Sequence, residues 1–173
     1  MSQTKDMERT VTLRDGSAAL IRPIRSEDSG ALLKALKKLS PNDIRSRFFS
    51  FVKELEPVVL DGLKKLDSER ELALVATNAN DPEEIWAGGR LFFEPDGQRA
   101  EYAAMVRSDR QGVGLGHAMM DTLIECGRQR EIVEIWGMVM SENRGMLKLA
   151  SRLGFEIRRD NDDASVKIVR KYL

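Results

Sequence analysis

Cysteine and histidine are nearly missing from this chain, in which Cys126 and His117 are the sole members of their types. One cysteine excludes an internal disulfide and fits a reducing compartment. Structural zinc sites take about four cysteine or histidine ligands, so the sequence excludes that class of site and predicts no bound metal. If both residues lie on one helix, about 13 Å along its axis separates them, which argues against a cysteine–histidine catalytic pair.

An excess of charge is also missing, because 28 lysines and arginines balance 28 aspartates and glutamates. A dedicated nucleic-acid-binding protein usually carries a clear basic excess, so we expect no nucleic acid as a partner. No apolar run approaches the roughly 20 residues of a membrane-spanning helix, and the N-terminus has no signal-peptide pattern. The sequence therefore predicts a cytoplasmic protein with no membrane partner.

The chain has enough apolar residues, 42% of 173, to form one domain with its own core, and we expect a single domain over 1–173. Turn dipeptides and apolar periodicity indicate where the elements lie. We expect two strands within 10–25, strands at 71–76, 84–93, 99–106, 132–140, 155–159 and 165–172, and helices from 26, from 41, at 58–66, from about 112 and at 143–153.

This order places one strand–helix–strand unit between antiparallel hairpins. Such an arrangement predicts an α/β (α+β) architecture, with a mixed, mostly antiparallel central sheet and helices on both faces. Ser26 and Asn143 stand where helix caps are expected.

The helix after residue 111 has an unusual start, because Gly112, Gly114 and Gly116 open it and no Ser, Thr, Asp or Asn precedes it as a cap. A helix N-terminus presents unpaired N–H groups and a partial positive charge, and glycine lets an anion approach the backbone closely. We infer that a phosphate group of a ligand supplies the cap. Neither the Walker pattern nor the G-x-G-x-x-G dinucleotide pattern fits this run.

Two motifs resemble the GNAT N-acetyltransferase superfamily. The run Gln111-x-x-Gly114-x-Gly116 resembles its acetyl-CoA pyrophosphate loop, and "ENRGMLKLASRLGFE" resembles its strand-to-helix segment that ends in Leu-Gly-Phe. "LRDGSAALIRPIRSED", "LSPNDIRSRFF", "ELALVA" and "AEYAAMVRSDRQGVGLG" are similar to the acetyltransferase domain of Pat-type protein lysine acetyltransferases. The resemblance implies a GNAT fold, acetyl-CoA as co-substrate and lysine-containing proteins as acceptors, with metabolic acyl-CoA synthetases as the leading substrate class.

The resemblance also implies roles for single residues. Glu101 matches the general base of Pat-type enzymes, although by itself it reads as a solvated carboxylate at a strand start. A backbone N–H of Met105 or Val106 is expected to donate to the thioester carbonyl. The other residues expected to contact acetyl-CoA are Arg107, Gln111, Gly112, Val113, Gly114, Leu115, Gly116 and Asn143.

Some positions leave alternatives open. Asn143 can bind the pantetheine arm, cap its helix, or do both. Ala150 stands where many GNAT enzymes have a tyrosine that protonates the leaving thiolate, so water is the expected proton source. Glu94 and Glu134 are interpreted as solvated carboxylates.

Two functional hypotheses remain beside lysine acetylation. One is a small-molecule amine acetyltransferase on the same fold, and the other is a non-catalytic acyl-CoA-binding module. Transfer to free amines but not to protein lysine would favour the first, whereas coenzyme binding without turnover would favour the second.

Overall fold

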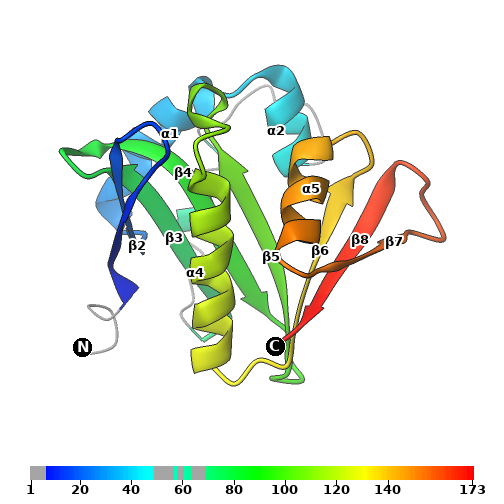
Figure 1. Ribbon diagram of the computed structural model, residues 1–173. Coiled ribbons are helices and arrows are strands. Elements are labelled where there is room, and N and C mark those ends of the chain that lie inside the picture. The colour runs from blue at the N-terminus through cyan, green and yellow to red at the C-terminus, as the bar shows by residue number, and fades with distance from the viewer. Residues whose placement is uncertain (1–6, 49–56, 58–60, 64–68) are drawn as a thin grey trace.

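One eight-stranded sheet runs through the protein, with strand order β1-β2-β3-β4-β5-β6-β8-β7 (Figure 1). The computed structural model describes residues 7–48, 57, 61–63 and 69–173. The strands are β1 Arg9–Thr12, β2 Ala18–Pro23, β3 Glu71–Asn78, β4 Asp81–Phe93, β5 Arg99–Val106, β6 Glu134–Met140, β7 Glu156–Arg159 and β8 Val166–Tyr172. The helices are α1 Ser29–Lys37, α2 Pro41–Phe48, α4 Leu115–Gln129 and α5 Arg144–Arg152, with short 3-10 turns η2 Ser26–Asp28 and η3 Ser108–Arg110.

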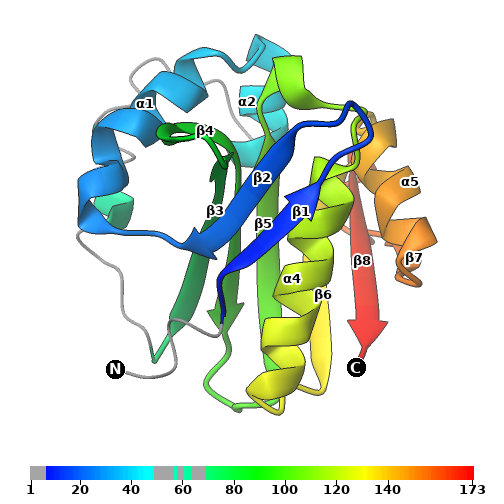
Figure 2. The ribbon, with the colours of Figure 1, turned by 60° about the vertical axis from the view of Figure 1, so that its left-hand side comes forward.

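The predicted order of elements and the mixed sheet are confirmed. β5 and β6 are parallel, and the other neighbouring strands pair in antiparallel fashion. Helices α4 and α5 pack on one face of the sheet, and α1 and α2 pack on the other (Figure 2). The helix expected at 58–66 lies largely outside the described residues, of which 61–63 are helical.

The start of the first helix differs from the prediction, because Ser26 opens a 3-10 turn and its side chain caps nothing there. The carboxylate of Asp28 makes the side-chain hydrogen bond at this turn instead, because it accepts the N–H of Arg25 at 2.7 Å. It also receives two hydrogen bonds from the guanidinium of Arg22, at 2.8 and 2.7 Å, and both side chains are buried. This ion pair fixes β2 against the turn that leads into α1.

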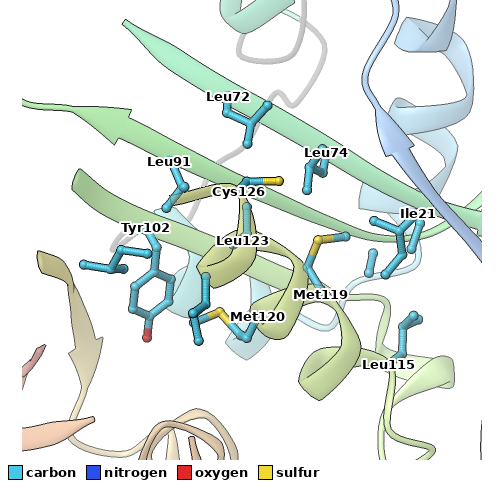
Figure 3. Packing of buried hydrophobic residues seen from close by; sticks show 14 of the residues in the cluster. Ile21, Leu72, Leu74, Leu91, Tyr102, Leu115, Met119, Met120, Leu123 and Cys126 are labelled. Carbon is cyan, nitrogen blue, oxygen red and sulfur yellow. The ribbon is translucent and has the colours of Figure 1, made fainter. Parts of the chain in front are cut away.

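Helix α4 contributes six buried residues to the larger core. Met119, Met120 and Leu123 are almost fully buried and face the strands of the sheet (Figure 3). The approach is close enough to require glycine on β4, since a Cβ on Gly89 would lie 2.8 Å from the Met119 sulfur and 2.9 Å from Leu123 Cδ1. This tight packing fixes the position of the helix whose N-terminus borders the site described below.

Replacing Asp28 with alanine should destabilise the protein, because it leaves the buried guanidinium of Arg22 without its carboxylate. Breaking a buried pair in this way costs about 3–5 kcal/mol, which chemical unfolding at neutral pH would measure. As a control, Arg9→Ala removes an exposed pair with Asp121 and should cost less than about 1 kcal/mol.

The free energy of unfolding that is lost in Asp28→Ala should depend on pH. Burial raises the pKa of Asp28, but hydrogen bonds from Arg22 and from the Arg25 backbone outweigh burial and hold this pKa below its ordinary value. A lowered pKa stabilises the fold above the unfolded-state value, near 3.9, and the stabilisation disappears as the pH falls through the folded-state value. The free energies of unfolding of the wild type and of Asp28→Ala should therefore converge at acid pH. Equal free energies of unfolding for the two proteins at neutral pH would contradict this role of Asp28.

Candidate active site

The site is organised by the point at which β5 and β6 part. In the described part of the chain these strands pair at Arg99–Glu134, Ala100–Ile135 and Glu101–Trp136. Beyond Glu101, β5 continues along β4 as far as Val106, whereas β6 continues along β8 as far as Met140. A wedge therefore opens between two neighbouring strands of one sheet, and Figure 1 shows α5 beside it.

The phase of the β4–β5 ladder decides which backbone groups of β5 face the wedge. Arg107 N–H donates to Trp86 O at 2.8 Å, and Glu94 N–H donates to Arg99 O at 2.8 Å. In an antiparallel ladder such bonded residues alternate, so the odd-numbered residues of β5 bond to β4. The N–H groups of Ala104 and Val106 consequently point into the wedge, whereas that of Met105 points at β4.

The wedge contains a cavity of about 220 Å³. It is lined by Asp43, Ala104, Met105, Val106, Gln111, Gly112, Gly116, Asn143, Gly145, Met146 and Leu149. Six of the residues that the sequence assigns to acetyl-CoA therefore lie on its wall, while Arg107, Val113, Gly114 and Leu115 do not. The walls come from β5, from the start of α4 and from α5.

The glycine-rich turn has backbone geometry that favours glycine. Gly112 has φ +80° and Gly114 has φ +94°, a region that residues with a Cβ rarely adopt. Gly114 is the N-cap of α4, and no side chain caps this helix start. Val113 contributes its carbonyl, which accepts the N–H of Arg14 at 3.0 Å, and Leu115 is buried in the core. The helix thus begins with N–H groups that are available to an anion.

Gln111 closes the other side of this turn. Its side-chain amide donates to Val106 O at 3.1 Å and to the carboxylate of Asp43 at 3.0 Å. Asp43 also accepts the hydroxyl of Ser108 at 2.5 Å, so α2 is attached to the connection between β5 and α4. Asp43 could not be assigned to this wall from the sequence, because its partners lie 65 and 68 positions away.

Helix α5 supplies the opposite wall and is capped as predicted. The side-chain oxygen of Asn143 accepts the N–H of Met146 at 3.2 Å, which leaves its NH₂ group for other partners. A salt bridge from Arg45 of α2 to Glu142 ties this wall to α2. Helix α2 therefore contacts both walls of the wedge.

The guanidinium of Arg107, which is expected to contact acetyl-CoA, is bound by carboxylates of this chain. Arg107 is 5% exposed, and its side chain donates to Asp109 at 2.6 and 3.0 Å and to Glu84 at 3.0 Å. Hydrogen bonds from Asn78 and Arg107 hold the pKa of Glu84 at about 2, so this carboxylate stays charged. Because its guanidinium is hydrogen-bonded to these carboxylates, Arg107 stabilises the end of β5, and its side chain is not placed as a phosphate ligand.

Glu101 lies at the apex of the wedge, opposite Trp136 in the last residue pair that joins β5 to β6. Ala100, Tyr102 and Ala104 pack with α4 and α5, whereas Met105 packs with α1. Side chains alternate along a strand, so Glu101 points to the α1 and α2 face. Burial, and secondly the negative charge of Glu94, raise the pKa of Glu101 above its ordinary value of 4.5.

The remaining residues singled out in the sequence have simpler surroundings. His117 is exposed on α4, Cys126 is buried in the core, and Ala150 is fully buried. Among the described residues no cluster of three or more His, Cys, Asp or Glu side chains could hold a metal ion. Within the same residues no helix is both long and apolar enough to cross a bilayer.

Known proteins share this fold and much of this sequence. The model of the Acetyltransferase (GNAT) family matches residues 40–155. Acetyltransferase PA5475 of Pseudomonas aeruginosa is 34% identical over 161 residues, which cover 92% of this chain and 86% of that protein. The crystal structure of the GNAT domain of S. lividans PAT superposes with a TM-score of 0.87 at 25% identity, covering 97% of this chain and 98% of that one.

A cAMP-binding acyltransferase from Mycobacterium smegmatis gives a TM-score of 0.65 at 23% identity, covering 95% of this chain but 46% of that one. The fold and these matches define the class of protein as an acyltransferase. The chain belongs to the GNAT acetyltransferase family, whose members use acetyl-CoA as co-substrate.

Replacing Arg107 with methionine should lower stability more than coenzyme affinity. The change removes charge-assisted hydrogen bonds to Glu84 and Asp109, and we expect the free energy of unfolding to fall by about 2 kcal/mol. Calorimetry should show the dissociation constant of acetyl-CoA rising less than about tenfold. A larger rise in a folded variant would instead mean that this side chain contacts the coenzyme, and Arg107→Lys should give an intermediate loss of stability.

Proposed function

We propose that this GNAT acetyltransferase transfers the acetyl group of acetyl-CoA to lysine side chains of proteins. The observation that carries the proposal is the position of Glu101, which lies where the wedge ends and faces the opposite side of the sheet from α4 and α5. The similarity to the S. lividans PAT domain agrees with the Pat-type resemblance of the sequence. Metabolic acyl-CoA synthetases are the substrate class that the resemblance favours.

Acetyl-CoA would bind in the wedge. The turn from Gln111 to Gly116 would hold the diphosphate, because an uncapped helix start with positive-φ glycines presents several N–H groups to an anion. The pantetheine arm would run between β5 and α5, where the free NH₂ group of Asn143 can donate to one of its carbonyls. Arg107 has no direct part in this binding.

The thioester carbonyl would lie against β5. Of the two expected donors, the ladder directs the Met105 N–H at β4 and the Val106 N–H into the wedge. Val106 is therefore the candidate that stabilises the developing negative charge on the carbonyl oxygen. Loss of such a donor typically lowers the rate by about 10²–10³.

Glu101 would act as the general base. A lysine ammonium, with a pKa near 10.4, must lose a proton before its nitrogen can attack. Glu101 accepts that proton, directly or through water, and passes it to solvent. The amine nitrogen then forms a bond to the acetyl carbon, the C–S bond breaks, and its electron pair leaves on sulfur. The new amide nitrogen releases its second proton, and the thiolate is protonated by water, because Ala150 offers no acidic group.

The rival acceptor is a small-molecule amine. The two hypotheses separate when purified protein is incubated with labelled acetyl-CoA and either an acyl-CoA synthetase or free polyamines and amino acids. We expect label on protein lysine. Label on free amines alone would reject the proposed acceptor class. Family membership as an acetyltransferase sets aside the non-catalytic module.

Glu101→Gln should lower kcat/KM for the acceptor by about 10²–10⁴, the usual contribution of a general base. Since burial and Glu94 raise the pKa of Glu101, wild-type activity should fall with decreasing pH at a value above 4.5. The variant should lack this step and should still bind acetyl-CoA. Full activity of Glu101→Gln at neutral pH would contradict the assignment.

Gly116→Val should block the wedge. A Cβ at Gly116 would already lie 3.3 Å from Leu149 Cδ2 and 3.5 Å from Val106 Cγ2, so a larger side chain occupies space that the pantetheine arm needs. We expect acetyl-CoA to bind more than about tenfold more weakly in calorimetry. Gly30→Ala on α1, where nothing lies within 4 Å, is the control and should leave affinity unchanged. Unchanged affinity in a folded Gly116→Val protein would place the coenzyme elsewhere.

A further inference from the structure

Beside Glu101 lies a second carboxylate to which the reaction above gives no role. Glu94 follows β4, and its backbone N–H donates to Arg99 O, which pairs Glu94 with Arg99 across the hairpin. Phe92 pairs with Glu101 in the same register. Glu94 and Glu101 are therefore diagonal neighbours on one face of the sheet, a relation that brings long side chains within reach of each other.

Two side-chain contacts hold the carboxylate of Glu94 in place. One carboxylate oxygen accepts the indole N–H of Trp136 at 2.6 Å, and the other lies 3.3 Å from the guanidinium of Arg99. Trp136 is also the partner of Glu101 on β6. The indole therefore reaches past Glu101 and fixes the second carboxylate next to it. This contradicts the sequence interpretation of Glu94 as a solvated carboxylate.

Exposed apolar side chains lie near the two carboxylates, beside the guanidinium of Arg99. Phe92 is 38% exposed and Met138 is 41% exposed, although both are large hydrophobic residues. Strand alternation places them on the same face as Glu101 and Trp136. Two acidic groups beside exposed apolar side chains match an acceptor that has an aliphatic chain and ends in a cation.

We propose that Glu94 is a positioning residue of the acceptor site, which binds the lysine ammonium and directs it to Glu101 while Phe92, Trp136 and Met138 flank the lysine methylenes. The proposal rests on the proposed function. Glu94 takes no proton in the reaction. It holds the ammonium by a charge-assisted hydrogen bond, and Glu101 removes the proton from the same nitrogen.

Other charges face this pair and enter any pH measurement. Arg99 lies on β5 next to Glu94, and Arg90 of β4 is paired with Glu71 at 3.2 Å. Glu134 of β6 is buried, within 3.6 Å of Arg99 and 3.0 Å of Arg170. Glu134, like Glu94, lies close to Arg99. It precedes Trp136, the partner of Glu101, by two positions on β6, so it serves as a matched control.

The test compares Glu94→Gln with Glu134→Gln, using a lysine-containing peptide as acceptor. In Glu94→Gln we expect the KM for the peptide to rise about five- to tenfold, while the KM for acetyl-CoA stays unchanged. The acid limb of kcat/KM should also move to lower pH, because a negative charge beside the base is removed. Trp136→Phe should raise the peptide KM by a smaller factor, and Glu94→Asp should recover part of the loss. Glu134→Gln should change neither the peptide KM nor the acid limb.

Three outcomes would overturn the inference. In the first, Glu94→Gln keeps the wild-type peptide KM and pH profile. In the second, Glu94→Gln and Glu134→Gln show equal losses together with equal drops in unfolding temperature, which would mean that Glu94 supports the hairpin only. In the third, the wild-type protein transfers nothing to any lysine peptide, which would reject the proposed acceptor class and this inference with it.

Discussion

The separation of β5 from β6 is the constraint on which the rest of the site depends. A sheet normally satisfies its backbone groups by strand pairing, and three residue pairs do so at the base of these two strands. Past Glu101 the N–H groups of Ala104 and Val106 face a cavity instead of a strand. The protein therefore obtains a set of fixed hydrogen-bond donors from its main chain, without using any side chain for them.

The same strand serves both substrates because its side chains alternate. Its even-numbered residues pack towards α4 and α5, beneath the wedge in which the coenzyme is proposed to bind, while Glu101 and Met105 face α1 and α2. The acceptor and the acetyl group would thus approach β5 from opposite sides and meet where the strands part. Helix α2 contacts both walls through Asp43 and Arg45, so it bridges them near this meeting point.

The sequence predicted the features that local chemistry determines. The glycines from 112 to 116 indicated a helix start without a side-chain cap, and Asn143 indicated a cap, because each depends on residues within a few positions. Contacts between distant residues were not predictable in this way. The pairing of Arg107 with Glu84, the contact of Asp43 with Gln111 and the indole bond to Glu94 each join separate elements. Preferring the N–H of Val106 over that of Met105 as the proposed donor to the thioester carbonyl required the hydrogen-bonding phase between β4 and β5. That phase cannot be read from the sequence of one strand.

The short junction between β5 and β6 also gives the sheet a mechanical property. Strands β1 to β5 form one half-sheet and β6, β8 and β7 form the other, and three residue pairs join them as a pivot. Val106 lies five residues past the last pair, about 16 Å along an extended strand. A relative rotation of about 5° at the pivot therefore changes the width at Val106 by about 1.5 Å. The aperture of the wedge is thus set by the relative twist of the two half-sheets, so substitutions as remote as the β7–β8 hairpin act on it through a lever arm.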